Sequence, residues 1–459
     1  MELIEQDAKT SIAREPPIGI CLAFGVGTVG TAILLNTVTV YLPAFMATVL
    51  GRSVATAGLL LTLSKLYDVL CDVVIGLASD RTRSRFGRRK PYMLAGALIG
   101  SLAFVTIFNP PIVDGPALLW EIGLLLVIYS TGYSLFNVPY LAMPPDIAVS
   151  YHGRTRLFSF RTVFVSIGQL AALSGTGWLL AAIGGGRHGY RVMGLLLGTV
   201  ILVTELGTVF GVRVPPPSIA PPSAVGRSWR GLLSNRAFAV LMGIKFTQLL
   251  GLSIAISTSL LFMLNVLGVG YGGQAVFSLA QNVLIAASMP VWLQTSRRLG
   301  KRRTAMIGIT IYSLGSLSWL LAGPGETSLG LAWRGGIMGI GAGALVLMIS
   351  SMLPDVMEQD AHLNGVQREG IFSSVFAIVE KVSFAVGPAL VGLFLGLAGY
   401  VPTRFGHLAA QPHRVHLALY AGVAILPAIM MLASLCLLFL YPLDEAALDR
   451  SRRVRTMPS

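Results

Sequence analysis

Asp68 and Asp72 stand one helical turn apart inside the apolar stretch 55–78. Residues four positions apart lie on the same face of a helix. A carboxylate in a segment that crosses a bilayer costs from about 2.5 to more than about 10 kcal/mol, so such a pair points first to a functional role. The spacing therefore predicts a place where a cation is bound and released inside a membrane. The other interpretation is a structural pair, neutralised by Lys65 on the same face and by a basic residue elsewhere.

The rest of the chain predicts the membrane helices that must position this pair. The 459 residues are 54% hydrophobic and only 12% charged, roughly half the charged fraction of a soluble domain. A spanning helix needs about 20 mostly apolar residues. The sequence therefore predicts an all-α integral membrane protein with twelve such helices, near residues 18–48, 55–79, 91–109, 117–145, 156–184, 189–212, 237–267, 271–296, 304–322, 330–353, 370–400 and 414–441.

Basic residues give the predicted helices an orientation. The net charge of +14 could suggest a nucleic-acid partner, but the basic residues cluster in short loops between apolar runs, which is the positive-inside pattern. Most of them follow the second, fourth, sixth and eighth helices, which places both termini in the cytoplasm. The first ten residues, MELIEQDAKT, are acidic where a cleaved signal peptide would be basic. We expect a multi-pass protein of the plasma membrane, or of the inner membrane in a bacterium.

The twelve helices fall into two halves. A segment rich in proline and arginine, 213–236, is a cytoplasmic linker between residues 1–212 and residues 237–441, and residues 442–459 form a cytoplasmic tail. The loop SRFGRRK after the second helix has a counterpart, SRRLGKRR, after the eighth. Two related six-helix halves, with a site between them at mid-membrane, are typical of transporters.

Signatures of an enzyme are absent from the sequence. It contains no HExxH motif and no P-loop, so neither metalloprotease chemistry nor direct ATP hydrolysis is expected. Cys21, Cys71 and Cys436 fall in apolar segments and form no CxxC pair, so we expect no disulfide framework, bound metal or cofactor. Energy for transport must then come from an ion gradient or from the gradient of the solute.

Three motifs together resemble a known family. YDVLCDVVIGLASDRTRSRFGRRKPYM covers the second helix and its loop, FNVPYLAMPPDI and GRTRLFSFRTVF cover the fourth and fifth helices, and QREGIFSSVFAIVEKVSFAVGPALVG lies in the eleventh. They are similar to the signatures of the glycoside–pentoside–hexuronide:cation symporters, the melibiose-permease branch of the major facilitator superfamily. The resemblance implies a major facilitator fold with two pseudo-symmetric halves and cation-coupled uptake by alternating access.

The resemblance also assigns roles to individual residues. Asp68 and Asp72 match the cation-binding carboxylates of the family, and Ser134 falls where a hydroxyl completes their site. Arg161 matches an arginine near this site, and Lys381 matches a lysine that faces the cation-binding helices. A lone ammonium inside the membrane is costly, so we expect Lys381 to pair with Asp68 or Asp72.

Other positions concern the solute. Tyr133 and Asn137, one turn apart, are expected to line a cavity. Sugar-transporting members of the melibiose type have acidic residues where this chain has Ala32 and Asn137, and Phe376 replaces a polar residue near the lysine of the eleventh helix. These departures keep open a second class of solute, an amphipathic lipid-like molecule.

The sequence leaves the coupling ion open. Na⁺ is a hard cation that prefers oxygen ligands, which the two carboxylates and Ser134 could supply. A proton needs only one carboxylate. An asparagine that the family carries just after the first carboxylate is Cys71 here, and the loss of this oxygen favours H⁺.

Two further groups of charged residues have expected partners. Lys245 and Glu205 lie within predicted membrane helices, and we expect a structural pair. The loop after the second helix matches a gating element of the superfamily, which is made of Asp80, Arg81, Gly87, Arg88 and Arg89. We expect a charge latch between this helix and its neighbours, made when the cavity faces outward and broken when it opens inward. The alternative is that these charges only orient the chain.

Together these features predict secondary active transport, by symport of a small organic solute with H⁺ or Na⁺. A glycoside or another carbohydrate is the first choice of solute. Uptake of a lipid-like solute and a non-transporting membrane sensor or assembly factor are the alternatives, but a sensor needs no ion-coupling site. The expected partners are the solute and the lipid bilayer, with no nucleic acid, and we expect a functional monomer.

Overall fold

The fold is described from a computed structural model of the chain. It describes residues 16–443 except 83, 85, 113, 148–150, 213–234 and 365–368. Most of the predicted linker 213–236 and of the predicted tail 442–459 lies outside these residues. Apart from one isolated β-bridge, the regular elements of the described residues are helices.

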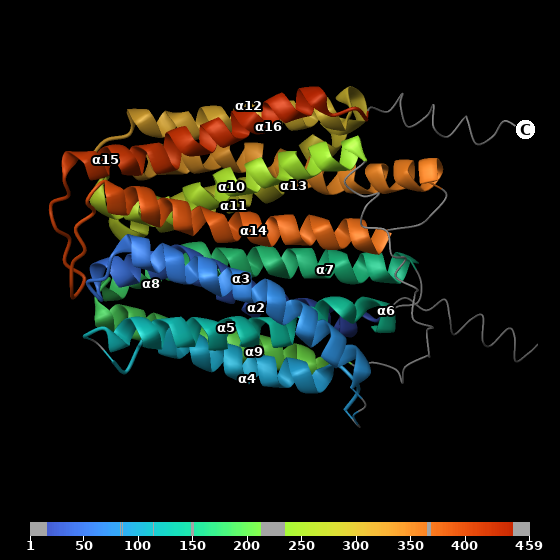
Figure 1. The fold of residues 1–459 in the computed structure, drawn as a ribbon, viewed down its shortest axis with the longest axis horizontal. Coiled ribbons are helices and arrows are strands. Elements are labelled where there is room, and N and C mark those ends of the chain that lie inside the picture. The colour runs from blue at the N-terminus through green and yellow to red at the C-terminus, as the bar shows by residue number, and fades with distance from the viewer. Residues whose placement is uncertain are drawn as a thin grey trace, which may run out of the picture. The chain divides into compact units, whose positions relative to one another are not determined.

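The helices follow the apolar stretches of the sequence (Figure 1). Their bounds are α2 Ile18–Thr48, α3 Val54–Arg81, α4 Lys90–Ile107, α5 Ala117–Ala142, α6 Pro144–Ile147, α7 Tyr151–Leu170, η1 Ala171–Gly175, α8 Thr176–Ile183, α9 Arg187–Gly211, α10 Arg236–Asn265, α11 Gly270–Leu299, α12 Lys301–Leu317, η2 Ser318–Leu321, α13 Ser328–Asn364, α14 Glu369–Leu397, α15 His413–Tyr420, η3 Ala421–Ile425 and α16 Leu426–Leu440. Several adjoining elements form one continuous span, as α7, η1 and α8 do.

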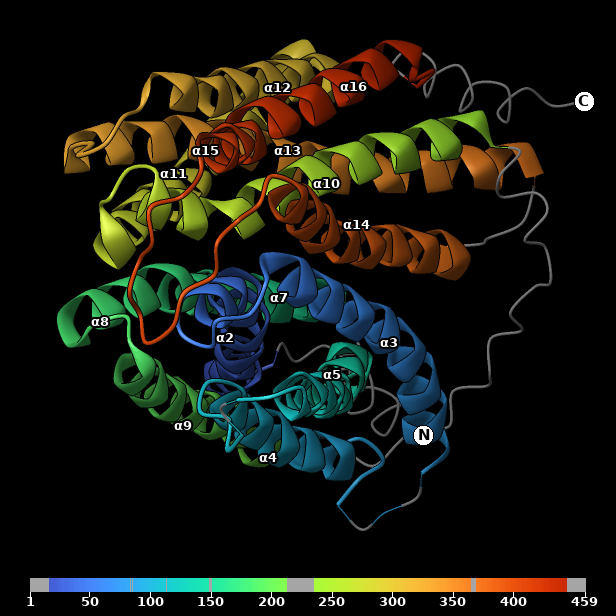
Figure 2. The same cartoon turned by 60° about the vertical axis from the view of Figure 1, so that its left-hand side comes forward.

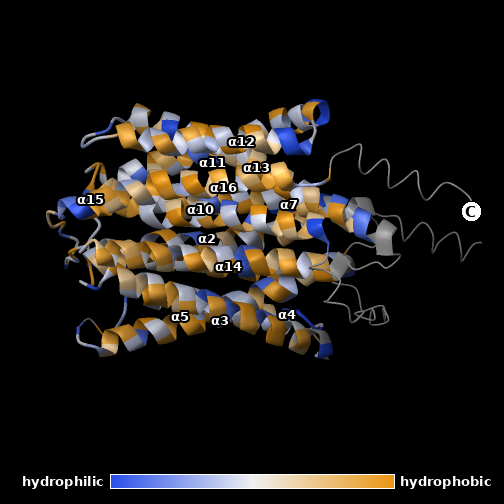
Figure 3. Cartoon of the chain, turned by 45° about the horizontal axis from the view of Figure 1, so that its top comes forward, coloured by the Kyte–Doolittle hydropathy of each residue, from blue (hydrophilic) through white to orange (hydrophobic). Residues whose placement is uncertain are grey.

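Eleven spans among the described residues are long and apolar enough to cross a membrane. The twelfth is α3, which is 28 residues long and carries Lys65, Asp68 and Asp72 within its apolar sequence. The predicted all-α fold with twelve spanning helices is therefore confirmed. Figure 3 shows hydrophobic residues along the helices and hydrophilic residues concentrated near their ends, as a bilayer requires.

The contacts between Cα atoms divide the chain into two compact units. Unit 1 comprises Met1–Arg52, Leu63–Pro221 and Thr403–His407, and unit 2 comprises Ser53–Thr62, Pro222–Pro402 and Leu408–Ser459. In unit 1, α2 packs against α7 and α9, and α4 packs against α5 and α9 (Figure 2). In unit 2, α10 packs against α14 and α16, and α13 packs against α11 and α12.

Two short segments belong to a different unit from their neighbours in sequence. The first part of α3 packs in unit 2, where Thr62 Oγ1 donates to the carbonyl oxygen of Ala385 at 2.6 Å. The segment after α14 enters unit 1, where Arg404 forms an antiparallel bridge with Leu50 and an ion pair of 3.0 Å with Asp114. Hydrogen bonds of the backbone therefore hold part of the loop between α14 and α15 in unit 1.

Glycines bring α4 and α5 into close contact. A Cβ on Gly132 would lie 2.5 Å from the backbone nitrogen of Gly100, and a Cβ on Gly96 would lie 2.4 Å from that of Phe136. Small residues of this kind let membrane helices approach backbone to backbone. The contact fixes α5, which carries Ser134, at a defined depth in unit 1.

Candidate cation site and inner-loop ion pairs

The helix α3 has an apolar side and a polar side. Leu66, Leu70 and Leu77 are exposed, as side chains that face lipid would be, while Lys65 and Asp68 are 8% and 3% exposed. The sequence produces this division because its polar residues recur at helical spacing. The paired carboxylates therefore point into unit 1 rather than toward the bilayer.

Polar contacts set the register between α3 and α5. Ser64 Oγ lies 2.8 Å from Ser130 Oγ, and one turn further on Tyr67 Oη lies 3.0 Å from Thr131 Oγ1. Hydrogen bonds between membrane helices, each worth roughly 1 kcal/mol, stabilise their association. These contacts between α3 and α5 place Asp68 at the same level as Ser134 of α5.

One hydroxyl contacts both carboxylates. Ser134 Oγ lies 2.6 Å from Asp68 Oδ1 and 2.6 Å from Asp72 Oδ1. A hydroxyl has a single proton to donate, so it can satisfy only one of the two carboxylates. The other close contact is favourable only when that carboxyl group carries its own proton or when a cation lies between the oxygens. The three residues therefore form a candidate site for a proton or a cation.

Lys65 lies on the border of this site. Its Nζ is 5.8 Å from the ring centroid of Tyr129 and 5.7 Å from that of Tyr133, within the range of cation–π interactions. The hydroxyl of Tyr129 donates to the carbonyl oxygen of Leu34 at 3.0 Å, which ties this group to α2. The structure thus brings Lys65 and Tyr133 together beside the polar side of α3.

Two other predicted residues lie further along α5 and α7. The hydroxyl of Tyr140 donates to the carbonyl oxygen of Phe24 at 3.0 Å, and the carbonyl oxygen of Arg161 accepts from Thr28 Oγ1 at 3.4 Å. Asn137 has no hydrogen-bond partner within the described part of the chain. Ala32 is 6% exposed, with its methyl group close to Gly168 in the contact of α2 with α7.

Lys381 is in α14, which belongs to unit 2, whereas both aspartates belong to unit 1. Its pairing with either aspartate therefore stays a prediction.

The predicted pair of Lys245 with Glu205 is wrong. Lys245 Nζ donates to Glu380 Oε2 at 2.9 Å and to the carbonyl oxygen of Phe376 at 2.9 Å. Glu205 is fully buried in unit 1, and neither of its carboxyl oxygens has a hydrogen-bond partner among the described residues. Sequence position alone could not reveal that α10 packs against α14, which brings residues 135 positions apart into contact.

The residues of the predicted latch meet an aspartate that sequence reasoning missed. Arg88 Nη2 donates to Asp146 Oδ1 at 3.0 Å, and Arg89 Nη1 donates to Asp146 Oδ2 and to the carbonyl oxygen of Ala142. Gly87 has a φ of +89°, which reverses the chain before these arginines. Arg81 ends α3 with its side chain exposed, and the side chain of Asp80 lies outside the description. The ion pairs therefore join the loop before α4 to α6.

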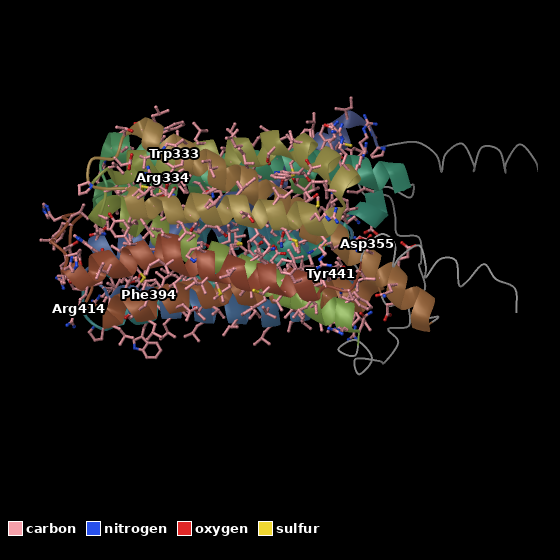
Figure 4. All side chains as sticks on the ribbon, turned by 90° about the horizontal axis from the view of Figure 1, so that it is seen from above. Trp333, Arg334, Asp355, Phe394, Arg414 and Tyr441 are labelled. Carbon is pink, nitrogen blue, oxygen red and sulfur yellow. The ribbon has the colours of Figure 1, made fainter. Side chains whose placement is uncertain are left out.

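Unit 2 has an equivalent arrangement. Gly300 has a φ of +80°, and Lys301 Nζ after it donates to Asp355 at 2.8 and 2.7 Å. Asp146 and Asp355 occupy matching motifs, MPPDI and MLPDV, and this repeat was the signal that could have identified them. In unit 2, Asp355 lies toward one end, and Arg334, which pairs with Glu326 at 3.0 Å, lies toward the other (Figure 4).

The sequence is similar to known transporters along most of its length. A family model described as MFS/sugar transport protein matches residues 23–445. A glucuronide carrier protein homolog of Escherichia coli is 25% identical over 434 residues, which cover 92% of this chain and 92% of that protein. An isoprimeverose transporter of Lactiplantibacillus pentosus is 26% identical over 373 residues, which cover 79% and 77%.

Solved structures share the fold at low sequence identity. A bacterial homolog of the human lysosomal transporter Spinster, in an inward-facing and occupied conformation, has a TM-score of 0.65 and 18% identity and covers 96% of this chain and 98% of that chain. A proton dependent oligopeptide transporter has a TM-score of 0.68 and 14% identity and covers 95% and 100%. At these identities the similarity concerns the fold alone.

Proposed function

This chain belongs to the MFS/sugar transport protein family, and we propose that it imports a carbohydrate together with protons by alternating access. Its fold is the twelve-helix major facilitator fold, and its relatives are transporters rather than enzymes. Two relatives are named for a glucuronide and for isoprimeverose, which supports a glycoside or another carbohydrate as the solute.

The contact of Ser134 with both aspartates carries the proposal. The Ser134 hydroxyl lies at hydrogen-bonding distance from one oxygen of each aspartate, so two carboxylates converge on one hydroxyl group. A proton binds to one carboxylate without any further ligand. A sodium ion would be expected to recruit more oxygen ligands, and the Cys71 thiol, which contacts Thr131 Oγ1 at 4.0 Å, offers none. We therefore favour H⁺ over Na⁺ as the coupling ion.

A lipid-like solute receives less support. Phe376 had suggested an apolar cavity, but its ring centroid lies 3.1 Å from the ammonium of Lys245. The ring is thus engaged by a charged group rather than offered to a hydrocarbon chain. Asn137 adds an amide that has no hydrogen-bond partner among the described residues, which suits a solute with hydroxyl groups.

Transport by purified protein in proteoliposomes tests the proposal. An inward H⁺ gradient or an inward Na⁺ gradient is imposed separately, and labelled methyl glycosides, glucuronides and pentosides are compared with a labelled lysolipid. We expect at least one carbohydrate to accumulate with the H⁺ gradient. Accumulation only with Na⁺ would overturn the choice of ion, and accumulation of the lysolipid alone would overturn the class of solute. Binding without transport would support the sensor alternative.

We further propose that the protein is a monomer in the cytoplasmic membrane with both termini inside. The positive-inside distribution of basic residues supports this orientation. A cysteine at Ser84, in a background without native cysteines, should resist an impermeant reagent added outside intact cells, whereas a cysteine at Ile112 should react. Both side chains are exposed, so the opposite pattern would reverse the topology.

A further inference from the structure

Glu380 in α14 differs from other acidic residues of the membrane helices by its exposure. Asp68 and Glu205 are 3% and 0% exposed, but the side chain of Glu380 is 56% exposed. A carboxylate within a membrane-spanning segment almost always faces the protein interior or a water-filled cavity rather than lipid. Glu380 therefore marks a polar surface of unit 2.

Lys245 holds one side of this carboxylate. Besides donating to Glu380 Oε2, it donates to the carbonyl oxygen of Phe376 and lies over the Phe376 ring. An ammonium has three donors, and the side chain of Lys245 is only 3% exposed. Lys245 is thus engaged entirely within the protein, whereas lone pairs of Glu380 remain on the exposed side.

The surface beside Glu380 is a polar side of α14. Ser373, Ala377 and Glu380 are exposed at helical spacing, and Lys381 continues this side of the helix. A separate side carries Leu393, which is 57% exposed and apolar, as a side chain facing lipid would be. The carboxylate and the lipid-facing residues therefore belong to different sides of α14.

Protein covers the same polar side of α14 nearer its Leu397 end. A Cβ on Gly392 would lie 2.8 Å from the carbonyl oxygen of Val54, and a Cβ on Gly58 would lie 2.2 Å from that of Pro388. These contacts come from the first part of α3, which belongs to unit 2. This side of α14 is thus an interior surface of the protein, covered near one end and exposed around Glu380.

The chemistry of the pair suits an uncharged ligand with several hydroxyl groups. A carboxylate accepts short, charge-assisted hydrogen bonds from hydroxyls. Because Lys245 already balances its charge, no cation on the ligand is required, and an anionic group would be repelled by the exposed oxygen. A neutral glycoside or sugar alcohol fits these conditions.

We propose that Glu380 binds hydroxyl groups of the transported solute and that Lys245 is the positioning residue that holds its carboxylate in place. The proposal rests on the proposed function, in which the solute is a carbohydrate. It adds an acceptor in unit 2 that is separate from the cation site in unit 1.

Binding of methyl glycosides and their monodeoxy analogues to the purified protein, measured by calorimetry, tests this role. For wild type, at least one deoxy analogue should bind about 10- to 100-fold more weakly than its parent, the range for a hydrogen bond to a charged group. In Glu380→Gln the affinity for the parent glycoside should fall by a similar factor. The parent and that deoxy analogue should then bind with nearly equal affinity. A purely structural role would weaken all ligands alike and leave their ratios unchanged.

Matched variants complete the experiment. Glu121→Gln makes the same change at a carboxylate that accepts from the backbone nitrogen of Ile112 at 3.0 Å, and its ligand ratios should match wild type. Lys245→Met leaves Glu380 without its counter-charge and can fail to fold, so Lys245→Met with Glu380→Gln is the informative variant. This double variant should fold, and its affinities for the parent glycoside and the deoxy analogue should be nearly equal, as in Glu380→Gln.

The outcomes separate this proposal from the proposed function. Suppose that Glu380→Gln leaves the affinity ratios between the parent glycoside and its deoxy analogues unchanged, while wild type accumulates the glycoside with an H⁺ gradient. This result would overturn the role of Glu380 and would not affect the proposal of carbohydrate symport. A wild-type protein that neither binds nor accumulates any glycoside would overturn both.

Discussion

Lys301 donates from Nζ to both carboxylate oxygens of Asp355, at 2.8 and 2.7 Å. In unit 1, Arg88 contacts both oxygens of Asp146 at 3.0 and 3.3 Å. Each basic residue follows a glycine with positive φ, and each aspartate follows a proline. The two units therefore share a glycine–cation turn and the aspartate that binds it.

The two pairs should differ in their contribution to stability. Asp146 binds two arginines, and the side chain of Arg89 is 10% exposed, whereas that of Lys301 is 39% exposed. Asp146→Asn should lower the free energy of unfolding by about 1–3 kcal/mol, and Asp355→Asn by less than about 1 kcal/mol. Thermal unfolding in detergent measures both, and equal shifts would contradict the difference in burial.

Ser134→Ala should impair coupling, because it removes the hydroxyl that contacts both aspartates. Solute accumulation driven by an H⁺ gradient should fall at least about tenfold, as a loss of roughly 1.4 kcal/mol implies. Ser130→Ala is the matched control, since Ser130 lies one turn earlier and contacts Ser64 in the same contact of α3 with α5. Similar accumulation by both variants would show that the hydroxyl of Ser134 has no special role.

Lys381 should interact with a carboxylate of α3 during transport, because an ammonium inside the membrane needs a counter-charge. Lys381→Ala should lower coupled uptake while exchange of solute down its gradient persists. Lys381→Ala combined with Asp68→Asn, or with Asp72→Asn, should lose less than the sum of the single losses. Strict additivity in both double mutants would assign Lys381 a different partner.

Glu205→Met should stabilise the protein. The carboxyl group is fully buried, and its two oxygens have no hydrogen-bond partner in the described residues. Replacing such a group by an apolar side chain of similar size removes an uncompensated desolvation cost of about 1–3 kcal/mol. The unfolding temperature should rise while uptake rates match wild type, and a variant that loses uptake would reveal a functional role for Glu205.

The sequence predicted those features that depend on local pattern. Apolar length predicted the helices, and the four-residue spacing of Asp68 and Asp72 predicted a shared face. The resemblance to a known family supplied Ser134, which the structure places in contact with both aspartates, while its part in binding a cation stays a prediction.

Features that depend on packing between distant helices could not be predicted in the same way. Lys245 was expected to pair with Glu205, but its partner is Glu380 because α10 packs against α14. Asp146 was visible within MPPDI, yet nothing local to that motif indicates that two arginines of the preceding loop reach it. Such pairings become evident only when both halves are compared or when the fold is known.

Proton movement accompanying solute entry tests the central claim most directly. Proteoliposomes in a lightly buffered medium receive an accepted glycoside, and the pH outside is followed without any imposed gradient. For wild type the outside medium should become more alkaline as the solute enters, and Asp68→Asn and Asp72→Asn should each abolish this change while remaining folded. Alkalinisation of wild-type size in both variants, or solute entry that requires Na⁺ and moves no protons, would contradict proton coupling at Asp68, Asp72 and Ser134.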